Sequence, residues 1–307
     1  MAARPSFGRD LTWRIEAGAF DLASAALRLL PVDWASGLGG ALFRTLGPIT
    51  RSHRIADRNI RLAFPDITEG ARAALLRAQW ENLGRAFFEF PLTDRITVAS
   101  GRVELVGGER LAAIAQGRLA TVFVSGHFSN WEVMPLVIVQ SGVTCQMTYR
   151  AANNPYVDES IKRRRARYGV RLFAPKGEEG ARELLVALKR GESVALMNDQ
   201  KFNEGPAAPF FGRTVHTASG PTRLALKFGA VLQPMSVQRL KGARFRVVVH
   251  DPIALENTGD RSSDLQAGVA KVNAFVEARV RERPAEWFWV HKRWPAATYA
   301  ELAEQGF

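Results

Sequence analysis

A histidine and a glutamate five positions apart, His127 and Glu132, are the residues whose types and spacing most favour chemistry in this chain. A histidine that is hydrogen-bonded to a carboxylate has a fixed tautomer and a raised basicity, which suits it to take a proton from a hydroxyl group. On one continuous helix such residues lie about 140° apart and share no face. We therefore expect His127 in the turn after a strand and Glu132 in the first turn of the next helix, where the helix dipole favours a carboxylate and the bend brings the two together.

The residues before the pair fit this arrangement, because an apolar run from 121 to 124 ends abruptly in a polar turn that contains Gly126. A catalytic and a structural histidine both remain open from this pattern alone. Two other chemistries are disfavoured. The histidines show no spacing typical of metal ligands, and Ser125 and Ser129 lie in no Gly-x-Ser-x-Gly motif. We expect neither a metal site nor a serine nucleophile.

The composition is that of a folded protein with an unusual charge. The 307 residues are 47% hydrophobic and 23% charged, and 42 Lys and Arg against 30 Asp and Glu give a net charge of +12. Such a field attracts nucleic acid, anionic lipid surfaces or acidic proteins. The single cysteine, Cys145, excludes an intramolecular disulfide and a cysteine-based metal cluster, and fits a reducing, cytosol-facing location.

Residues 11–46 predict two amphipathic helices, with Asp33 as a plausible N-cap of the second and Gly47-Pro48 as its end. Their heavy apolar load is explained by packing on the main domain, by a position in a membrane interface, or by both. Charged residues interrupt the apolar stretches well short of the roughly 20 residues that a membrane crossing needs, and we see no cleavable signal peptide.

A stripe of four arginines follows on one helical face: Arg51, Arg54, Arg58 and Arg61. A solvated face and a surface that meets anionic headgroups are both open. A further helix is expected to run to about residue 90, with Thr68 as a candidate cap.

From residue 102 the pattern changes to short apolar runs that alternate with helical segments, which predicts an α/β fold with a mixed, largely parallel central sheet flanked by helices. We divide the chain into an N-terminal amphipathic helical segment, 1–50, and an α/β domain, 51–307. The expected strands are 103–106, 120–125, 143–148, 170–173, 193–197, 231–237 and 245–249. The expected helices are 108–116, 131–140, 154–168, 178–190, 218–229 and 262–283.

The segment Val124-Ser-Gly-His127-Phe-Ser-Asn-Trp-Glu132 resembles the His-x-x-x-x-Asp/Glu motif of the glycerolipid and lysophospholipid acyltransferases. Further motifs resemble the late lipid A acyltransferases, the bacterial lauroyl and myristoyl transferases, and occur in that family's order over about residues 55–295. They are Asn59-Ile-Arg-Leu-Ala-Phe-Pro65, Tyr149-Arg150, Asn154-Pro155, Lys176-Gly177 with Arg182, Asn198-Asp199-Gln200, Pro209-Phe-Phe-Gly212 with Thr217, and Trp287-Phe-Trp-Val-His-Lys-Arg-Trp294.

This resemblance implies transfer of a fatty acyl chain from acyl carrier protein, as a thioester co-substrate, to a hydroxyl of a phosphorylated glycolipid acceptor, with no other cofactor. It implies that His127 is the general base and Glu132 its orienting partner. It also implies a place at the cytoplasmic face of the bacterial inner membrane. Many relatives have an N-terminal transmembrane helix, whereas the charges in this chain predict a peripheral, monotopic attachment to an anionic membrane surface.

Candidates for substrate binding are Arg150, Lys176, Arg182, Asp199 and Gln200, although a salt bridge or a loop contact explains each equally well. Asn130 is expected to cap the helix that follows it. The basic run 162–165 covers most of a helix circumference, so part of it should face solvent.

Three alternatives stay open. The chain could acylate another glycolipid or a lysophospholipid with acyl-CoA as the donor. A non-enzymatic basic protein could bind a membrane surface or nucleic acid. Because no RNA- or DNA-binding signature is recognisable, we expect no nucleic acid partner.

Overall fold

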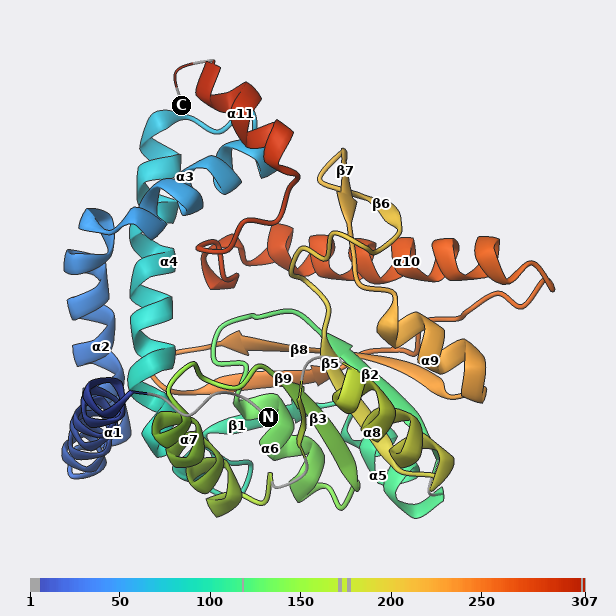
Figure 1. Cartoon of the computed structure of the whole chain (residues 1–307), viewed down its shortest axis with the longest axis horizontal. Coiled ribbons are helices and arrows are strands. Elements are labelled where there is room, and N and C mark those ends of the chain that lie inside the picture. The colour runs from blue at the N-terminus through green and yellow to red at the C-terminus, as the bar shows by residue number, and fades with distance from the viewer. Residues whose placement is uncertain (1–5, 118, 171–172, 176–177, 305, 307) are drawn as a thin grey trace.

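A computed structural model describes residues 6–117, 119–170, 173–175, 178–304 and 306. A seven-stranded sheet lies at its centre (Figure 1), in the strand order β1-β9-β8-β2-β5-β3-β4. Neighbouring strands are parallel except β8 and β9. The predicted mixed, largely parallel sheet is therefore confirmed. The strands are β1 Val103–Val106, β2 Thr121–Ser125, β3 Cys145–Tyr149, β4 Phe173–Pro175, β5 Ser193–Met197, β8 Val231–Arg239 and β9 Phe245–Val249.

Strand β2 lies in the middle of this sheet, and all five of its residues are buried. A strand that is buried on both faces has consecutive apolar residues rather than alternating ones, as Val122, Phe123 and Val124 show. The polar turn with His127 follows beyond its carboxyl end, at the sheet edge where α/β proteins gather ligand-binding groups.

Helices connect and cover the strands close to where the sequence predicts them. They are α5 Gly108–Gly117, α6 Val133–Gln140, α7 Pro155–Arg167, α8 Glu178–Lys189, α9 Gly220–Phe228 and α10 Arg261–Glu282. The last of these buries Val269, Val272, Val276 and Val280, the apolar positions spaced by three and four residues.

A small hairpin, β6 Ala207–Phe210 and β7 Arg213–His216, was not predicted from the sequence. Its two turn residues, Phe211 and Gly212, both have positive φ, at 51° and 68°, as a type I′ hairpin turn requires. Phenylalanine is rare in that conformation. Here the Phe211 amide donates a 2.5 Å hydrogen bond to a Glu277 oxygen of α10, and this bond holds the turn in place.

The N-terminal helices stand at one side of the sheet in Figure 1. They are α1 Phe7–Arg28, α2 Val32–Leu46, α3 Arg51–Ala63 and α4 Glu69–Glu89, with the short helices η1 Gly47–Ile49 and η2 Phe90–Arg95. Helix α2 lies against α4 where Gly39 faces Gly84. A Cβ atom added at Gly84 would lie 2.1 Å from the Gly39 carbonyl oxygen, so this close approach requires glycine.

Two of the predicted helix boundaries are confirmed and one is wrong. Thr68 caps α4 by accepting from the Ala71 amide, and α2 ends at Leu46, just before Gly47. Asp33, however, is not the N-cap of α2, which is Pro31. Its carboxylate instead accepts from the Ala243 amide and from Arg102, so it ties α2 to the sheet domain.

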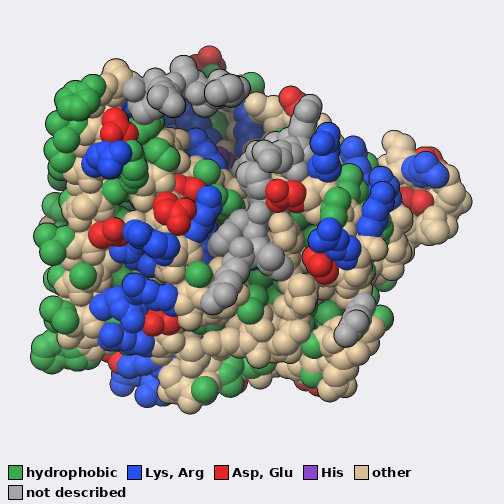
Figure 2. Space-filling model, turned by 60° about the horizontal axis from the view of Figure 1, so that its bottom comes forward, with side chains coloured by type: hydrophobic (Ala, Val, Ile, Leu, Met, Phe, Trp, Pro, Cys, Tyr) green, Lys and Arg blue, Asp and Glu red, His purple; other side chains and the backbone are tan. Residues whose placement is uncertain are grey.

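Helix α2 and η1 carry a row of exposed apolar side chains, which we call the apolar face: Trp34, Leu38, Leu42, Leu46 and Ile49, with Trp34 71% and Ile49 82% exposed. In Figure 2 hydrophobic side chains gather along the left edge of the molecule, the side on which α1 and α2 lie in Figure 1. Within the described residues, no helix is both long and apolar enough to cross a membrane.

The chain ends with η3 Pro284–Glu286, a segment rich in tryptophan, and α11 Ala296–Glu304. Trp287, Trp289 and Trp294 are almost fully buried in the main core. This closing segment brings the C-terminal end of the chain next to the carboxyl end of β2, because Phe128 and Trp287 form a β-bridge.

Candidate active site

His127 and Asp199 form a hydrogen-bonded pair at the carboxyl ends of the adjacent parallel strands β2 and β5. His127 Nδ1 lies 2.7 Å from Asp199 Oδ1, and the other carboxylate oxygen accepts from the His127 amide at 2.7 Å. That oxygen also accepts from the indole N–H of Trp287 at 2.8 Å. Three donors therefore surround one carboxylate that is only 3% exposed.

Asp199 remains ionised at neutral pH in spite of its burial. Burial alone would raise its pKa, but the neighbouring charge of His127 and the hydrogen bonds from His127 and Trp287 outweigh that effect and hold the pKa below its usual range. An ionised Asp199 accepts a hydrogen bond from the Nδ1–H group of His127. In the neutral imidazole the lone pair is therefore on Nε2. Within the described part of the chain, Nε2 has no hydrogen-bond partner.

The ring of His127 stands between two aromatic side chains and stays accessible. Its centroid lies 5.3 Å from that of Trp131 and 5.9 Å from that of Phe288, and its side chain is 19% exposed. Aromatic walls restrict the ring's rotation and shield it partly from water. These are the conditions in which a neutral imidazole accepts a proton from a bound group rather than from solvent.

The turn after His127 is held by the closing segment of the chain. Ser129 has a φ of 45°, a conformation that non-glycine residues rarely adopt. Its amide donates to the Glu286 carbonyl at 2.7 Å, while the Phe288 amide donates to the His127 carbonyl at 3.1 Å. Such contacts compensate for a backbone conformation that costs about 1–3 kcal/mol on its own.

Glu132 lies at the N-cap of α6, close to where the sequence predicts it, but no hydrogen bond joins it to His127 among the described residues. Its two carboxylate oxygens are occupied by Arg165 of α7, at 2.9 and 2.5 Å, and one of them also by the Tyr168 hydroxyl at 2.9 Å. Burial would raise the pKa of Glu132, and the Arg165 charge more than offsets this, so the net direction is downward. The contact expected between Glu132 and the imidazole is made by Asp199.

Asn130 does not cap α6 with its side chain, which corrects the expectation from the sequence. Its amide group donates to Glu89 Oε2 at 3.0 Å. Glu89 is fully buried and is paired with Arg239 of β8 at 2.5 Å, and it also accepts from Ser36 of α2 at 2.6 Å. One buried carboxylate thus connects the turn that carries His127 with α2, α4 and β8.

The side chains of the basic run 162–165 form more ion pairs than those of a solvated face would. Lys162 pairs with Asp158 at 2.9 Å, and Arg163 and Arg164 both contact Asp21 of α1. Arg164 is 8% exposed. The run therefore attaches α7 to the N-terminal helix as well as to Glu132.

The remaining candidates lie at the same sheet edge, on helix α8 or outside the described residues. Arg150 is exposed and directly follows β3, the neighbour of β5, while Gln200 is half-buried and follows Asp199. Arg182 is exposed on α8. Lys176 lies outside the described residues. Of the predicted site residues that the structure describes, His127 and Asp199 are hydrogen-bonded to each other.

A small apolar cavity of about 60 Å³ adjoins the site beneath the ends of β2, β3 and β5. Four methionines contribute to its wall: Met134, Met147, Met197 and Met235. Ser125, two residues before His127, also lines it. Methionine side chains are flexible, so such a cavity adapts its shape to an apolar guest. In the described part of the chain, no group of three or more His, Cys, Asp or Glu residues has an arrangement that suits a metal ion.

Comparison with known proteins places these observations in a family. The family model described as bacterial lipid A biosynthesis acyltransferase matches residues 12–296. The chain is 25% identical over 270 residues to a lipid A biosynthesis palmitoleoyltransferase of Escherichia coli, covering 85% of this chain and 84% of the relative. It is 25% identical over 269 residues to the lauroyltransferase of the same organism, covering 84% and 82%.

A third relative is named for a different acceptor. The phosphatidylinositol mannoside acyltransferase of Mycobacterium tuberculosis is 25% identical over 230 residues, covering 72% of this chain and 71% of the relative.

Proposed function

This chain belongs to the bacterial lipid A biosynthesis acyltransferase family and is an O-acyltransferase that acts on lipid A-like substrates, and we propose that it uses His127 as the general base. The observation that carries this proposal is the His127–Asp199 pair at 2.7 Å, which leaves Nε2 able to accept a proton. Such a base is what a hydroxyl group needs when it attacks a thioester carbonyl.

In the proposed reaction the acceptor hydroxyl oxygen forms a bond to the carbonyl carbon of the acyl thioester while its proton passes to His127 Nε2. The carbon–sulfur bond then breaks and the thiolate takes that proton, so the products are the ester and the free thiol. Asp199 holds Nδ1–H and stabilises the imidazolium that forms in between. Trp287 and the His127 amide keep the Asp199 carboxylate in place.

We assign Glu132 a supporting role. Its ion pair with Arg165 and its hydrogen bond from Tyr168 fix the start of α6 directly after the His127 turn. Substitution of Glu132 should therefore reduce turnover less than substitution of His127 or Asp199.

For the donor we propose acyl carrier protein thioester, and for the acceptor a phosphorylated glycolipid. The net charge of +12 favours both an acidic carrier and an anionic lipid. Arg150, Lys176, Arg182 and Gln200 are the proposed substrate-binding residues. The cavity lined by methionines is the proposed start of the acyl-chain site. A second candidate function, acylation of another glycolipid from acyl-CoA, is favoured by the relative that is named for phosphatidylinositol mannoside.

We further propose a peripheral, monotopic attachment at the cytoplasmic face of the bacterial inner membrane, with residues 1–50 as the membrane-interface segment and 51–307 as the catalytic domain. The exposed apolar face of α2 supports this. Vesicle flotation tests it, because Trp34→Glu with Leu42→Glu should reduce binding, whereas unchanged flotation of the folded double variant would rule out this face.

The activity itself is tested with purified protein, acyl carrier protein loaded with a fatty acid, and the Kdo-bearing tetraacyl precursor. A pentaacyl product should appear by mass spectrometry, and parallel reactions with acyl-CoA distinguish the donors. His127→Ala should abolish product formation while the protein stays folded. Full turnover by that variant would remove the base assignment, and salt-dependent binding to oligonucleotides in place of activity would favour the nucleic acid alternative.

A further inference from the structure

Helices α8 and α9 lie side by side against the sheet and share an outer surface that is rich in cations. Their inner side chains, such as Leu184 and Leu224, belong to one core cluster, so their opposite sides face solvent. In Figure 2 Lys and Arg side chains gather on the right of the molecule, the side on which α8 and α9 lie in Figure 1. We define the basic face as five exposed residues of this surface: Val186, Lys189, Arg190, Arg223 and Lys227.

The basic face follows the helical repeat. On α8, Lys189 and Arg190 lie three and four residues after Val186, and the Arg190 amide still donates to the Val186 carbonyl at 3.1 Å. On α9, Lys227 lies four residues after Arg223. Side chains at these spacings are neighbours on one side of a helix. Val186, 39% exposed, is therefore an apolar residue among cations, and an apolar centre with a polar rim is typical of protein-binding surfaces.

The four cations of the basic face have no carboxylate partner in the part of the chain that the structure describes. Arg223 donates to the Ser219 hydroxyl at 3.3 Å, which leaves its charge in place. Helix α9 contains no acidic residue. On α8, Glu183 is half-buried and accepts from Gln146 at 3.3 Å.

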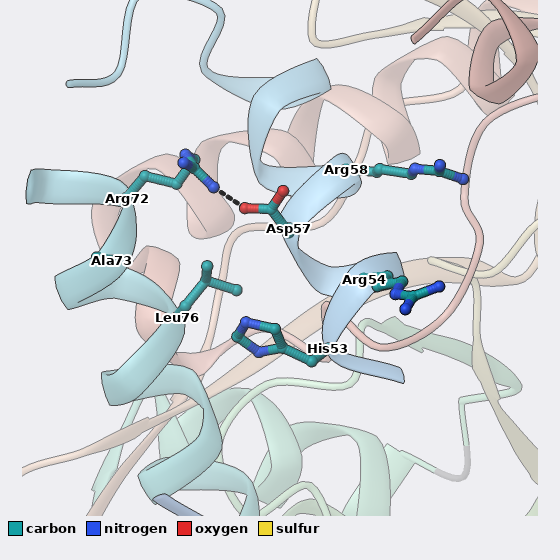
Figure 3. Close-up of a pocket in the computed structure, with 7 residues that line it drawn as sticks. All are labelled: His53, Arg54, Asp57, Arg58, Arg72, Ala73 and Leu76. Atoms are coloured by element: carbon teal, nitrogen blue, oxygen red, sulfur yellow. Dashed lines mark hydrogen bonds and ion pairs between the residues drawn. The ribbon is translucent and has the colours of Figure 1, made fainter. Parts of the chain in front are cut away.

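Other helices neutralise their cations within the chain. In the pocket between α3 and α4, for example, Arg72 is hydrogen-bonded to Asp57, as Figure 3 shows. The basic run of α7 is paired with Asp158, Asp21 and Glu132. The basic face differs from these helices because its charges are available to a partner.

The basic face also lies on the side of the sheet opposite the apolar face. Figure 1 shows α2 at one side of the molecule and α8 and α9 at the other. With α2 on a membrane, as proposed above, α8 and α9 point away from the bilayer. The partner that reaches them is therefore a soluble one, and the free cations require it to be acidic.

Both helices begin near the sheet edge that carries His127. Helix α9 leads into β8, which is parallel to β2, so α9 starts at the edge where β2 and β5 end. The start of α9 is close to β5 there, since a Cβ atom added at Gly220 would lie 3.8 Å from a Leu196 methyl group. Arg223 is in the first turn of α9, and Arg182, one turn before Val186, continues the row of cations on α8 towards the same edge.

We propose that the basic face is the docking surface for an acidic carrier protein that holds the acyl chain as a thioester, and this inference rests on the proposed function. A carrier seated there lies beside the edge at which the thioester must meet His127. Exposed charges of this kind speed up association and select the partner, while an apolar contact such as that of Val186 contributes to holding it.

Binding of acyl carrier protein tests the docking surface without any need for activity. The probe is dye-labelled acyl carrier protein, loaded with a fatty acid and titrated with the full chain at low salt by fluorescence anisotropy. The double variant Lys189→Glu with Lys227→Glu should weaken binding about tenfold, because exposed charge pairs change affinity by a few-fold each. The matched control is Arg54→Glu with Arg77→Glu, which makes the same change of net charge at exposed positions of α3 and α4.

The proposal is overturned if the two double variants weaken binding equally, since only the net charge would then act, or if the unmodified chain does not bind the carrier. It is also overturned if the basic-face variant binds the carrier normally and loses flotation with phosphatidylglycerol vesicles, because this surface would then meet the membrane. Circular dichroism and thermal unfolding verify that both variants are folded.

Steady-state kinetics separate this proposal from the proposed function. The basic-face variant should raise KM for the acyl carrier protein thioester about tenfold, with unchanged kcat and unchanged KM for the glycolipid acceptor. Transfer from the carrier with an unchanged carrier KM in this variant overturns the docking surface and leaves the function standing. Carrier binding that depends on the basic face, without transfer from any donor, supports the docking surface and contradicts the function.

Discussion

The substitution Asp199→Asn tests the assignment of the catalytic pair most directly. Asp199 accepts three hydrogen bonds, at 2.7, 2.7 and 2.8 Å, and two of them reach the same oxygen. An asparagine oxygen would keep the bonds from the His127 amide and from Trp287. The amide NH₂ would then face His127 Nδ1 as a donor, which forces the ring proton to Nε2 and removes the lone pair that accepts the substrate proton.

The expected loss follows from that change of tautomer. A histidine base held in the wrong tautomer by this substitution loses on the order of 10⁴-fold in kcat. We expect a fall of about 10³–10⁴-fold here, with a KM that changes little because Asp199 is only 3% exposed. The assay is steady-state transfer from the acyl carrier protein thioester, with product quantified by mass spectrometry.

Two further measurements make this result interpretable. Thermal unfolding and tryptophan fluorescence show whether the variant keeps its fold, since the retained bonds should preserve Trp287 in place. Glu132→Gln serves as a comparison, because its carboxylate bonds Arg165 rather than the imidazole and its loss of kcat should be much smaller. A folded Asp199→Asn enzyme with more than a tenth of the normal kcat would refute the orienting role of Asp199, as would a larger loss in Glu132→Gln.

Three other outcomes are expected. Glu89→Ala leaves the buried Arg239 charge without its partner, so it should lower the free energy of unfolding, measured in urea, by about 3–5 kcal/mol. Glu104→Ala breaks an exposed ion pair and should lower the free energy of unfolding by less than about 1 kcal/mol. Similar losses in the two variants would contradict the network at Glu89. Burial lowers the pKa of His250 to about 4, so the unfolded chain binds more protons than the folded chain as the pH falls below 6.5, and stability should decrease from there towards pH 4. If the urea midpoint of His250→Gln falls between pH 6.5 and 4.5 as steeply as that of the unmodified chain, another group is responsible. Met147→Phe should fill the methionine-lined cavity and lower kcat/KM for the longest acyl donors relative to the shortest; an unchanged preference would place the acyl chain elsewhere.

The sheet was predictable because each strand is encoded locally. Strands 103–106, 193–197 and 245–249 were predicted with the bounds that the structure has, since short apolar runs between turn residues carry that information. The β6–β7 hairpin was missed because Phe211 takes the position where a turn normally has asparagine or aspartate. Tertiary contact with α10 overrides the local preference there.

The catalytic pair was only half predictable. His127 and Glu132 were predicted to be a pair because they are near each other in sequence. Asp199 instead reaches the imidazole because β2 and β5 are neighbours in the sheet. Strand order is not encoded in periodicity, so Asp199 was expected only as one of several substrate-binding residues. A signal was present, since an acidic residue directly after a buried parallel strand lies at the edge where other strands also end.

The closing segment from Trp287 to Trp294 has a consequence for how the enzyme is made. It supplies the indole that holds Asp199, the amide that binds the His127 carbonyl, and the two carbonyls that accept from Asn59 of α3. These residues leave the ribosome after every strand of the sheet has done so. A nascent chain that has already paired β2 with β5 therefore has its histidine and its aspartate but lacks the contacts that fix them, and the ability to transfer an acyl group arises only after residues 287–294 have been made.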